Sequence, residues 1–274
     1  MKRLALILAI FLLPPLGLRA QDKAGYEALD SLLTVYCESM QLEENETKQR
    51  ECDFMISSCA DSLTREHVAR ALFDHYAGSM VMGEEAVAIY IYDNWFANGK
   101  LSIGGEYVAM DAEIFATFNR QNLIGCDAPR ITLEKPCGGK MEIPAEGRTS
   151  ILFFFDTACS KCRFTIAALP AALDEVDFPV NFYAIYCGSD KKSWAEFRRD
   201  FRLGNPKIKV THLWDPDYDS DYQLKYGVIS TPKTFVVEPQ GTILGRRLEP
   251  DSLKELMVYA GIILDTYSKH YKSE

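Results

Sequence analysis

The sequence predicts an α/β domain that follows a small all-helical domain. Between residues 24 and about 122, apolar residues recur with the spacing of amphipathic helices. From Ile124 onward, short apolar runs typical of buried strands alternate with helical segments, and one strand–helix–strand unit has the order of a parallel crossover. The 274 residues are enough for two modest domains. The expected parts are an N-terminal segment over 1–20, the helical domain over 21–122 and the α/β domain over 123–274.

Five helices are expected in the helical domain. The first presents one apolar face that includes Leu29 and Leu33. The next three are expected over 44–59, 64–78 and 84–98. Asp111 is expected to cap a short fifth helix, because an aspartate side chain accepts hydrogen bonds from unpaired backbone N–H groups.

The α/β domain is expected to contain six strands and one added strand. The six are predicted over 131–133, 140–143, 150–155, 180–186, 234–237 and 242–246, and the added one over 208–213. Helices are expected over 159–174 and 222–226, and from Asp251. Ser193 and Glu196 have capping-box spacing and predict the start of a further helix.

The N-terminus has the pattern of a secretory signal peptide. Lys2 and Arg3 precede an apolar stretch over 4–18, and Ala20 is a small residue at a cleavage position. The alternative, an uncleaved membrane anchor, is disfavoured because the stretch is shorter than the roughly 20 residues that span a bilayer. We expect export to the periplasm without a lipoprotein cysteine and without stable membrane insertion after cleavage.

The net charge argues against a nucleic-acid partner, and the cysteine content suits an exported protein. The formal net charge is −9, and a negative surface repels phosphate backbones, so no nucleic-acid partner is expected. The chain has eight cysteines, which suits a compartment where disulfides persist.

A Cys-x-x-Cys pair, Cys159 and Cys162, directly follows the apolar strand over 150–155. At the N-terminus of a helix, unpaired backbone N–H groups stabilise a thiolate. Cys159 is therefore expected to be the nucleophile, and Cys162, one turn further, the buried thiol that resolves a mixed disulfide. A structural disulfide between the two cysteines is the alternative interpretation. Lys161 either adds positive charge or points into water.

Thr231 and Pro232 precede the predicted strand over 234–237. A cis proline here would hold the backbone of Thr231 opposite the dithiol, where an extended substrate could pair with it as an added strand. Together with the dithiol, this position predicts that Thr231 and Pro232 position the substrate.

These motifs resemble the thioredoxin superfamily, and more narrowly the periplasmic TlpA/ResA-like reductases. The resemblance covers residues 124–260 and rests on the Cys159–Cys162 turn, the run Tyr-Gly-Val-Ile-Ser-Thr-Pro over 226–232, the hairpin over 239–243 and the long stretch between dithiol and proline. It implies a thioredoxin-like fold with a central mixed sheet flanked by helices. It also implies a membrane thiol-electron donor if the protein works as a reductase. The first half is similar to helical domains that precede thioredoxin modules in exported bacterial proteins.

One departure from the family concerns proton transfer. Thioredoxin-like proteins often have a buried acid six residues before the first cysteine, and this chain has Phe153 there. Asp156 is the candidate proton acceptor in its place, with a turn residue as the alternative interpretation.

Three cysteines lie in the helical domain. Cys52 and Cys59 are seven residues apart, so on one helix their Cα atoms would be about 10 Å apart, too far for a disulfide. Cys37, on the preceding helix, could pair with either of them.

The other cysteines lie in the α/β domain. Cys126 and Cys137 bracket its first strand and could link its two ends. Cys187 is expected to be a buried filler rather than a third redox thiol. No metal or cofactor is expected, because the four histidines are not at ligand spacing and no second Cys-x-x-Cys is present.

The leading functional hypothesis is an exported thiol:disulfide oxidoreductase that acts on exported protein disulfides or dithiols. The alternative is a non-enzymatic redox-sensitive binding or scaffold protein, in which the helical domain recognises a partner. A peroxidase is a third hypothesis.

Overall fold

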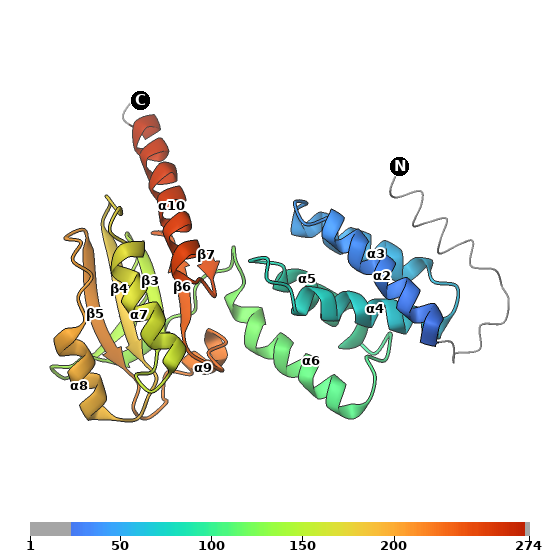
Figure 1. The fold of residues 1–274 in the computed structure, drawn as a ribbon, viewed down its shortest axis with the longest axis horizontal. Coiled ribbons are helices and arrows are strands. Elements are labelled where there is room, and N and C mark those ends of the chain that lie inside the picture. Colours follow the sequence, from blue (N-terminus) through green and yellow to red (C-terminus); the bar gives the residue numbers. More distant parts are fainter. Residues whose placement is uncertain (1–22, 272–274) are drawn as a thin grey trace. The chain divides into compact units, whose positions relative to one another are not determined.

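A computed structural model describes residues 23–271 of the chain, with side chains over 26–264. It divides into two compact units, Met1–Arg120 and Gln121–Glu274 (Figure 1). The predicted signal peptide lies outside the described residues. Among those described, no helix is long and apolar enough to cross a membrane.

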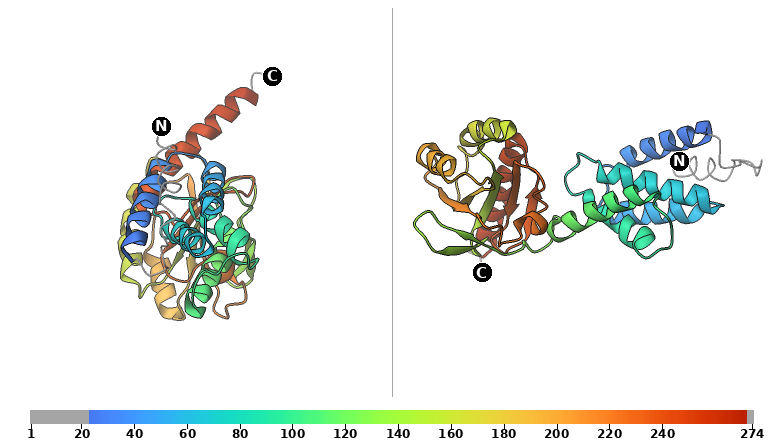
Figure 2. Two further views of the ribbon diagram at one scale, coloured as in Figure 1. Left: turned by 90° about the vertical axis from the view of Figure 1, so that its right-hand side faces the viewer. Right: turned by 90° about the horizontal axis from the view of Figure 1, so that it is seen from below.

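The first unit is built from helices (Figure 2). They are α2 (Lys23–Ser39), α3 (Asn45–Ser58), α4 (Ser62–Ala77), α5 (Glu85–Ile91), the π-helical turn η1 (Tyr92–Phe96) and α6 (Glu106–Asn119). The start predicted for the fifth helix is wrong, because α6 begins at Glu106 and Asp111 is an exposed residue within it. Gly105, with the extended backbone of an N-cap (φ −68° and ψ 167°), directly precedes this helix and allows the earlier start.

A buried ion pair crosses the core of this unit. The Lys48 ammonium lies 2.8 Å from the Glu84 carboxylate, and their side chains are 3% and 5% exposed. The Ser79 hydroxyl donates to Glu84, and Lys48 also donates to the carbonyl of Gln41. These contacts satisfy two charged groups that apolar surroundings alone would destabilise.

The second unit contains a seven-stranded mixed sheet in the order β2-β1-β5-β4-β3-β6-β7. The strands are β1 (Ile131–Glu134), β2 (Lys140–Ile143), β3 (Thr149–Phe155), β4 (Val180–Tyr186), β5 (Ile208–Trp214), β6 (Lys233–Val237) and β7 (Ile243–Arg246). The helices are α7 (Ser160–Ala172), α8 (Lys191–Asp200), α9 (Tyr222–Lys225) and α10 (Pro250–Tyr271), and the 3-10 turn η2 (Arg120–Asn122) precedes the sheet. The predicted fold class, a thioredoxin-like sheet preceded by helices, is confirmed.

Each face of this sheet has its own core. Helices α7, α8 and α10 pack on one face, where Phe153 and Phe155 of β3 contact them. The short helix α9 packs on the other face, against Leu152 and Phe154. Successive side chains of a strand point to opposite faces, so a strand covered on both faces is apolar throughout. All seven residues of β3 are buried for this reason.

Two details of this unit differ from the sequence-based expectation. The sheet has two parallel pairs, β3–β4 and β4–β5, where one crossover was expected, because β5 extends the sheet next to β4. Helix α8 begins at Lys191, and its cap is Asp190, whose carboxylate accepts hydrogen bonds from the N–H groups of Lys192 and Ser193. An aspartate at this position satisfies the first turn, so Ser193 does not serve as the cap.

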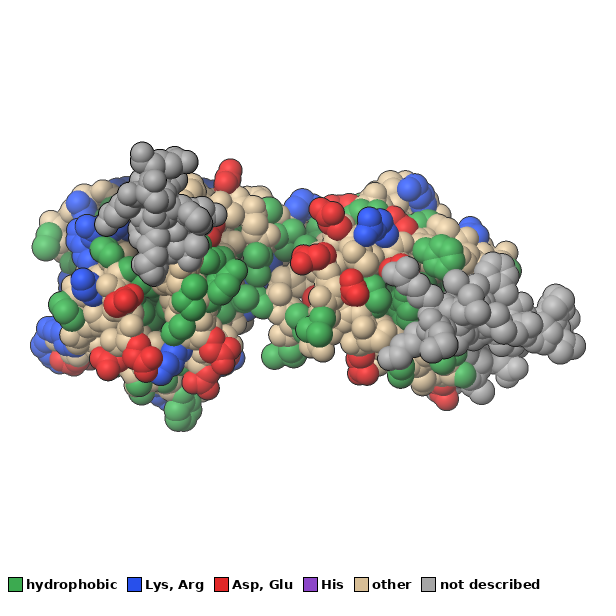
Figure 3. Space-filling model, turned by 90° about the horizontal axis from the view of Figure 1, so that it is seen from above, with side chains coloured by type: hydrophobic (Ala, Val, Ile, Leu, Met, Phe, Trp, Pro, Cys, Tyr) green, Lys and Arg blue, Asp and Glu red, His purple; other side chains and the backbone are tan. Residues whose placement is uncertain are grey.

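Charged side chains are spread over the surface of both units. On the face drawn in Figure 3, acidic and basic side chains are interspersed with hydrophobic ones.

Candidate active site

The dithiol lies where the central strand meets a helix. Strand β3 ends at Phe155, and α7 begins at Ser160 with Cys159 as its N-cap. Cys159 has extended backbone angles, φ −77° and ψ 120°, which turn the chain from the strand into the helix. Its N–H donates to the carbonyl of Asp156 at 3.2 Å and closes the intervening turn. The Cys-x-x-Cys pair therefore occupies the first turn of α7.

The sulfur of Cys159 has two backbone partners. The N–H of Cys162 donates to the Cys159 Sγ at 3.2 Å, the bond that a capping side chain normally accepts. The Cys159 thiol donates to the carbonyl of Thr231 at 3.3 Å. The Thr231–Pro232 peptide bond is cis and directly precedes β6. β6 pairs antiparallel with β3, which places Thr231 beside the end of β3 that leads to Cys159.

The pKa values of the two thiols are shifted in opposite directions. Burial alone would raise the pKa of Cys159, but hydrogen bonds from the Cys162 thiol, the Cys162 N–H and the Thr231 side chain favour the thiolate and hold its pKa below the usual value. Cys162 is fully buried, and burial raises its pKa to about 11. Cys159 is therefore the more readily ionised of the two thiols.

Asp156 contacts the site through its backbone. Its N–H donates to the Cys162 Sγ at 3.5 Å, whereas its carboxylate accepts the N–H of Ala158 at 2.8 Å. This carboxylate bond is that of a turn residue. Phe153, at the position of the family's buried acid, is fully buried and stacks on Phe155 with 5.4 Å between ring centroids.

Lys161, between the two cysteines, forms an ion pair with Glu249. The two charged groups are 2.7 Å apart, and their side chains are 63% and 54% exposed. The ammonium is thus held by a carboxylate at the solvent surface.

Cys187 and Tyr222 lie on the α9 face of the sheet, near the end of β3 that leads to the dithiol. The N–H of Cys187 donates to the carbonyl of Phe155, so the residue adjoins the last position of β3. Burial raises the pKa of Cys187 to about 12, with contributions from nearby Cys162 and Asp156, and Tyr222 hydrogen-bonds to its thiol. Sequence reasoning missed Tyr222, because α9 is distant along the chain and only the sheet brings it to this place.

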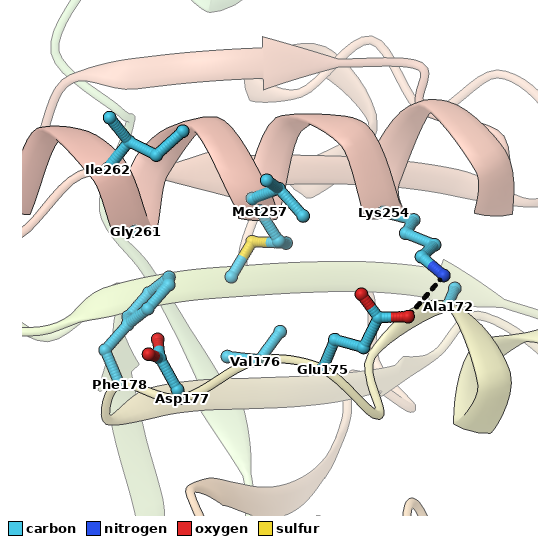
Figure 4. Close-up of a pocket in the computed structure, with 10 residues that line it drawn as sticks. Ala172, Glu175, Val176, Asp177, Phe178, Lys254, Met257, Gly261 and Ile262 are labelled. Atoms are coloured by element: carbon cyan, nitrogen blue, oxygen red, sulfur yellow. Dashed lines mark hydrogen bonds and ion pairs between the residues drawn. The ribbon is translucent and has the colours of Figure 1, made fainter.

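The cavity of about 350 Å³ in Figure 4 is separate from the dithiol. It lies between α10 and the segment that joins α7 to β4, with Phe178 and Met257 in its wall. An ion pair of 2.8 Å between Lys254 and Glu175 borders it. The cavity is not part of the candidate site, because its lining includes neither Cys159 nor Thr231.

The remaining thiols form no disulfide in this structure. All eight cysteines are free, and Cys126 and Cys137 are exposed. In the described part of the chain, no group of three or more histidine, cysteine or acidic side chains could hold a metal ion.

Comparisons with known proteins identify this architecture. Residues 124–246 match the AhpC/TSA family. The structure is similar to that of a thioredoxin-like protein from Bacteroides caccae, with a TM-score of 0.66, 15% sequence identity, and coverage of 88% of this chain and 87% of that one. The second unit has a thioredoxin-like fold.

The match to the Bacteroides caccae protein also extends over the helical unit, because it covers far more of the chain than the second unit alone. Two further structures match over about half of the chain. The thioredoxin domain of a thiol-disulfide oxidoreductase from Bacteroides vulgatus has 19% identity and a TM-score of 0.43, over 50% of this chain and 96% of that one. A domain of a possible thiol-disulfide isomerase from Cytophaga hutchinsonii has 22% identity and a TM-score of 0.43, over 57% and 100%. No curated protein matches the chain.

Proposed function

We propose that this protein is an exported thiol:disulfide oxidoreductase that exchanges electrons with protein disulfides through Cys159 and Cys162. One observation carries the proposal: the sulfur of Cys159 caps α7 and lies 3.3 Å from the carbonyl of Thr231. A partly exposed thiol with a lowered pKa, one helical turn from a buried thiol with a raised pKa, is the arrangement that thiol–disulfide exchange requires.

The exchange proceeds in two balanced steps. The Cys159 thiolate attacks one sulfur of a substrate disulfide, a mixed disulfide forms, and the other substrate sulfur leaves as a thiolate. Cys162 then loses its proton and attacks the Cys159 sulfur, which releases the second substrate thiol and leaves a Cys159–Cys162 disulfide. Two electrons have passed to the substrate, and an external dithiol must return them before the next cycle.

The backbone at Thr231 supports the binding of an extended polypeptide. When Cys159 ionises, its thiol no longer donates to the Thr231 carbonyl, which can then accept an N–H of a substrate strand. Phe164, on α7, and Ile229, in the segment before Thr231, are 78% and 67% exposed. Apolar side chains on the two segments that carry the site favour a protein substrate over a small polar one.

The partners follow from the proposed location. The N-terminal sequence pattern supports export to the periplasm, where protein disulfides and dithiols are the substrates. A membrane thiol-electron donor would restore the reduced state if the enzyme works as a reductase.

The test is insulin reduction together with trapping of a covalent intermediate. Cys159→Ser should abolish turnover, and Cys162→Ser should accumulate a mixed disulfide that dithiothreitol releases. Cys126→Ser, at an exposed thiol in the same unit, is the matched control and should retain activity. Unchanged turnover in Cys159→Ser would refute the proposal and favour the scaffold alternative. Peroxide consumption without disulfide exchange would favour a peroxidase.

A further inference from the structure

Two thiols meet in the core of the helical unit, away from the proposed dithiol. Cys37 is on α2 and Cys52 is on α3, and their side chains are 2% and 0% exposed. Both belong to the same buried apolar cluster. The site described above makes no use of either residue.

Two hydrogen bonds link α3 to α2 and to the turn between them, and they indicate the level of each cysteine. The short connection from Met40 to Glu44 makes consecutive helices antiparallel. The Tyr36 hydroxyl donates to the Glu51 carboxylate at 2.5 Å. Nearer the turn, the Lys48 ammonium donates to the Gln41 carbonyl at 3.0 Å. Residues at one level of two antiparallel helices have residue numbers with a constant sum, and Cys37 and Cys52 have the same sum as Gln41 and Lys48, so they lie at matching levels.

A third helix connects the two sulfur atoms. The side chain of Tyr76, which is on α4 and is 2% exposed, lies near both thiols and favours the ionised form of each. Both thiols therefore face the same buried side chain.

Cys59, the other cysteine of this unit, is engaged elsewhere. Its thiol donates to the carbonyl of Met55 at 3.3 Å, and its own carbonyl accepts a hydrogen bond from Arg65. It follows Cys52 by seven residues, which on a helix corresponds to about 10 Å. The geometry therefore favours Cys52 over Cys59 as the neighbour of Cys37.

A cavity borders one of the two thiols. It has a volume of about 250 Å³, and its wall includes Cys37 together with Asp30, Thr34 and His75. Part of this lining is polar, and the volume is several times that of a water molecule. We therefore expect a small disulfide such as hydroxyethyl disulfide to reach Cys37.

We propose that Cys37 and Cys52 form a second redox pair, whose disulfide links α2 to α3 and whose oxidant is a small-molecule disulfide. The Cys37 thiolate attacks the oxidant and forms a mixed disulfide, with release of one small thiol. Cys52 then attacks the Cys37 sulfur and releases the second small thiol. The protein loses two electrons and two protons, and the oxidant becomes two thiols.

The raised pKa values of the two thiols should determine how fast they are oxidised. Burial raises the pKa of Cys37 to about 11 and that of Cys52 well above its usual value. Few molecules are ionised at neutral pH, so the oxidation should be slow there. It should accelerate about tenfold per pH unit up to the pKa of Cys37.

The test uses the full chain with Cys159→Ser and Cys162→Ser, so that the proposed active site contributes no disulfide. After incubation with hydroxyethyl disulfide at pH 8.5, remaining thiols are alkylated in denaturant and peptides are mapped by mass spectrometry. A peptide pair that joins Cys37 to Cys52, two mass units lighter than the reduced pair, is the expected result. The disulfide should also raise the midpoint of thermal unfolding of the helical unit by roughly 5 °C.

Matched variants separate the outcomes. Cys59→Ser should leave the cross-link and its stabilisation intact, whereas Cys37→Ser and Cys52→Ser should each remove both. A Cys37–Cys59 cross-link, or two unreacted thiols at Cys37 and Cys52 after prolonged oxidation of the folded protein, would overturn the proposal. These outcomes are independent of insulin reduction, which tests the proposed function.

Discussion

The backbone N–H of Cys162 donates a hydrogen bond of 3.2 Å to the sulfur of Cys159. This bond gives the Cys159 sulfur the role of a helix N-cap, a position normally taken by an oxygen of serine, threonine, aspartate or asparagine. A thiolate accepts such a bond more strongly than a thiol, so the start of α7 stabilises the reactive form of the residue.

Alkylation kinetics should distinguish the two thiols of the pair. The pKa of Cys159 is below its usual value, and that of Cys162 is raised to about 11. Thiolate forms as pH rises through each pKa, so the iodoacetamide rate at Cys159 should level off below pH 9, whereas that at Cys162 should still be rising at pH 10. Peptide mapping after brief labelling assigns each rate. Faster labelling of Cys162 than of Cys159 would contradict the assignment of the nucleophile.

Thr231→Val should slow alkylation of Cys159 at pH 7 by about threefold to tenfold. The substitution removes the hydroxyl whose hydrogen bond favours the thiolate, so the pKa of Cys159 should increase. The pH profile of labelling should move to higher pH, and activity at pH 7 should decrease with it. Ser230→Ala, at the exposed neighbouring residue, is the control and should leave the profile in place.

Cys187→Ala should retain insulin reduction to within about twofold, because a thiol with a pKa of about 12 is almost entirely protonated near pH 7. The substitution removes buried volume, so the free energy of unfolding should decrease by about 1 kcal/mol. Cys162→Ala, assayed in parallel, should lose turnover. If Cys187→Ala lost turnover with its fold intact, Cys187 would be a third redox thiol.

The buried pair of Lys48 and Glu84 offers a test of the helical core. Glu84→Gln leaves the Lys48 ammonium without its counter-charge at 3% exposure, and should lower the free energy of unfolding by about 3–5 kcal/mol. The double variant Lys48→Met and Glu84→Gln should be destabilised by less than the sum of the single variants. Urea titrations of the four proteins give the coupling energy. Arg70→Met and Asp74→Asn, which remove an exposed ion pair, should change stability by less than about 1 kcal/mol.

Several elements were predictable because their determinants are local. The apolar run of β3 and the helical periodicity of the first unit are properties of neighbouring residues, and both correspond to elements of the structure. Helix starts were less predictable where two caps compete. Asp190 and Ser193 both suit the start of α8, and only the backbone shows that the Asp190 carboxylate binds the first turn.

That a Cys-x-x-Cys pair follows a buried strand could be predicted from local sequence, since strand propensity and the turn lie within a few adjacent residues. The groups that face each thiol depend on the tertiary structure. The carbonyl of Thr231 reaches Cys159 from 72 residues away, because β6 pairs with β3, and Tyr222 reaches Cys187 because α9 packs on that face of the sheet. Cys37 and Cys52 likewise enter one buried cluster because the helices that carry them pack into the same core. Contacts of this kind depend on the order of strands and the packing of helices, which residues adjacent in the chain do not encode.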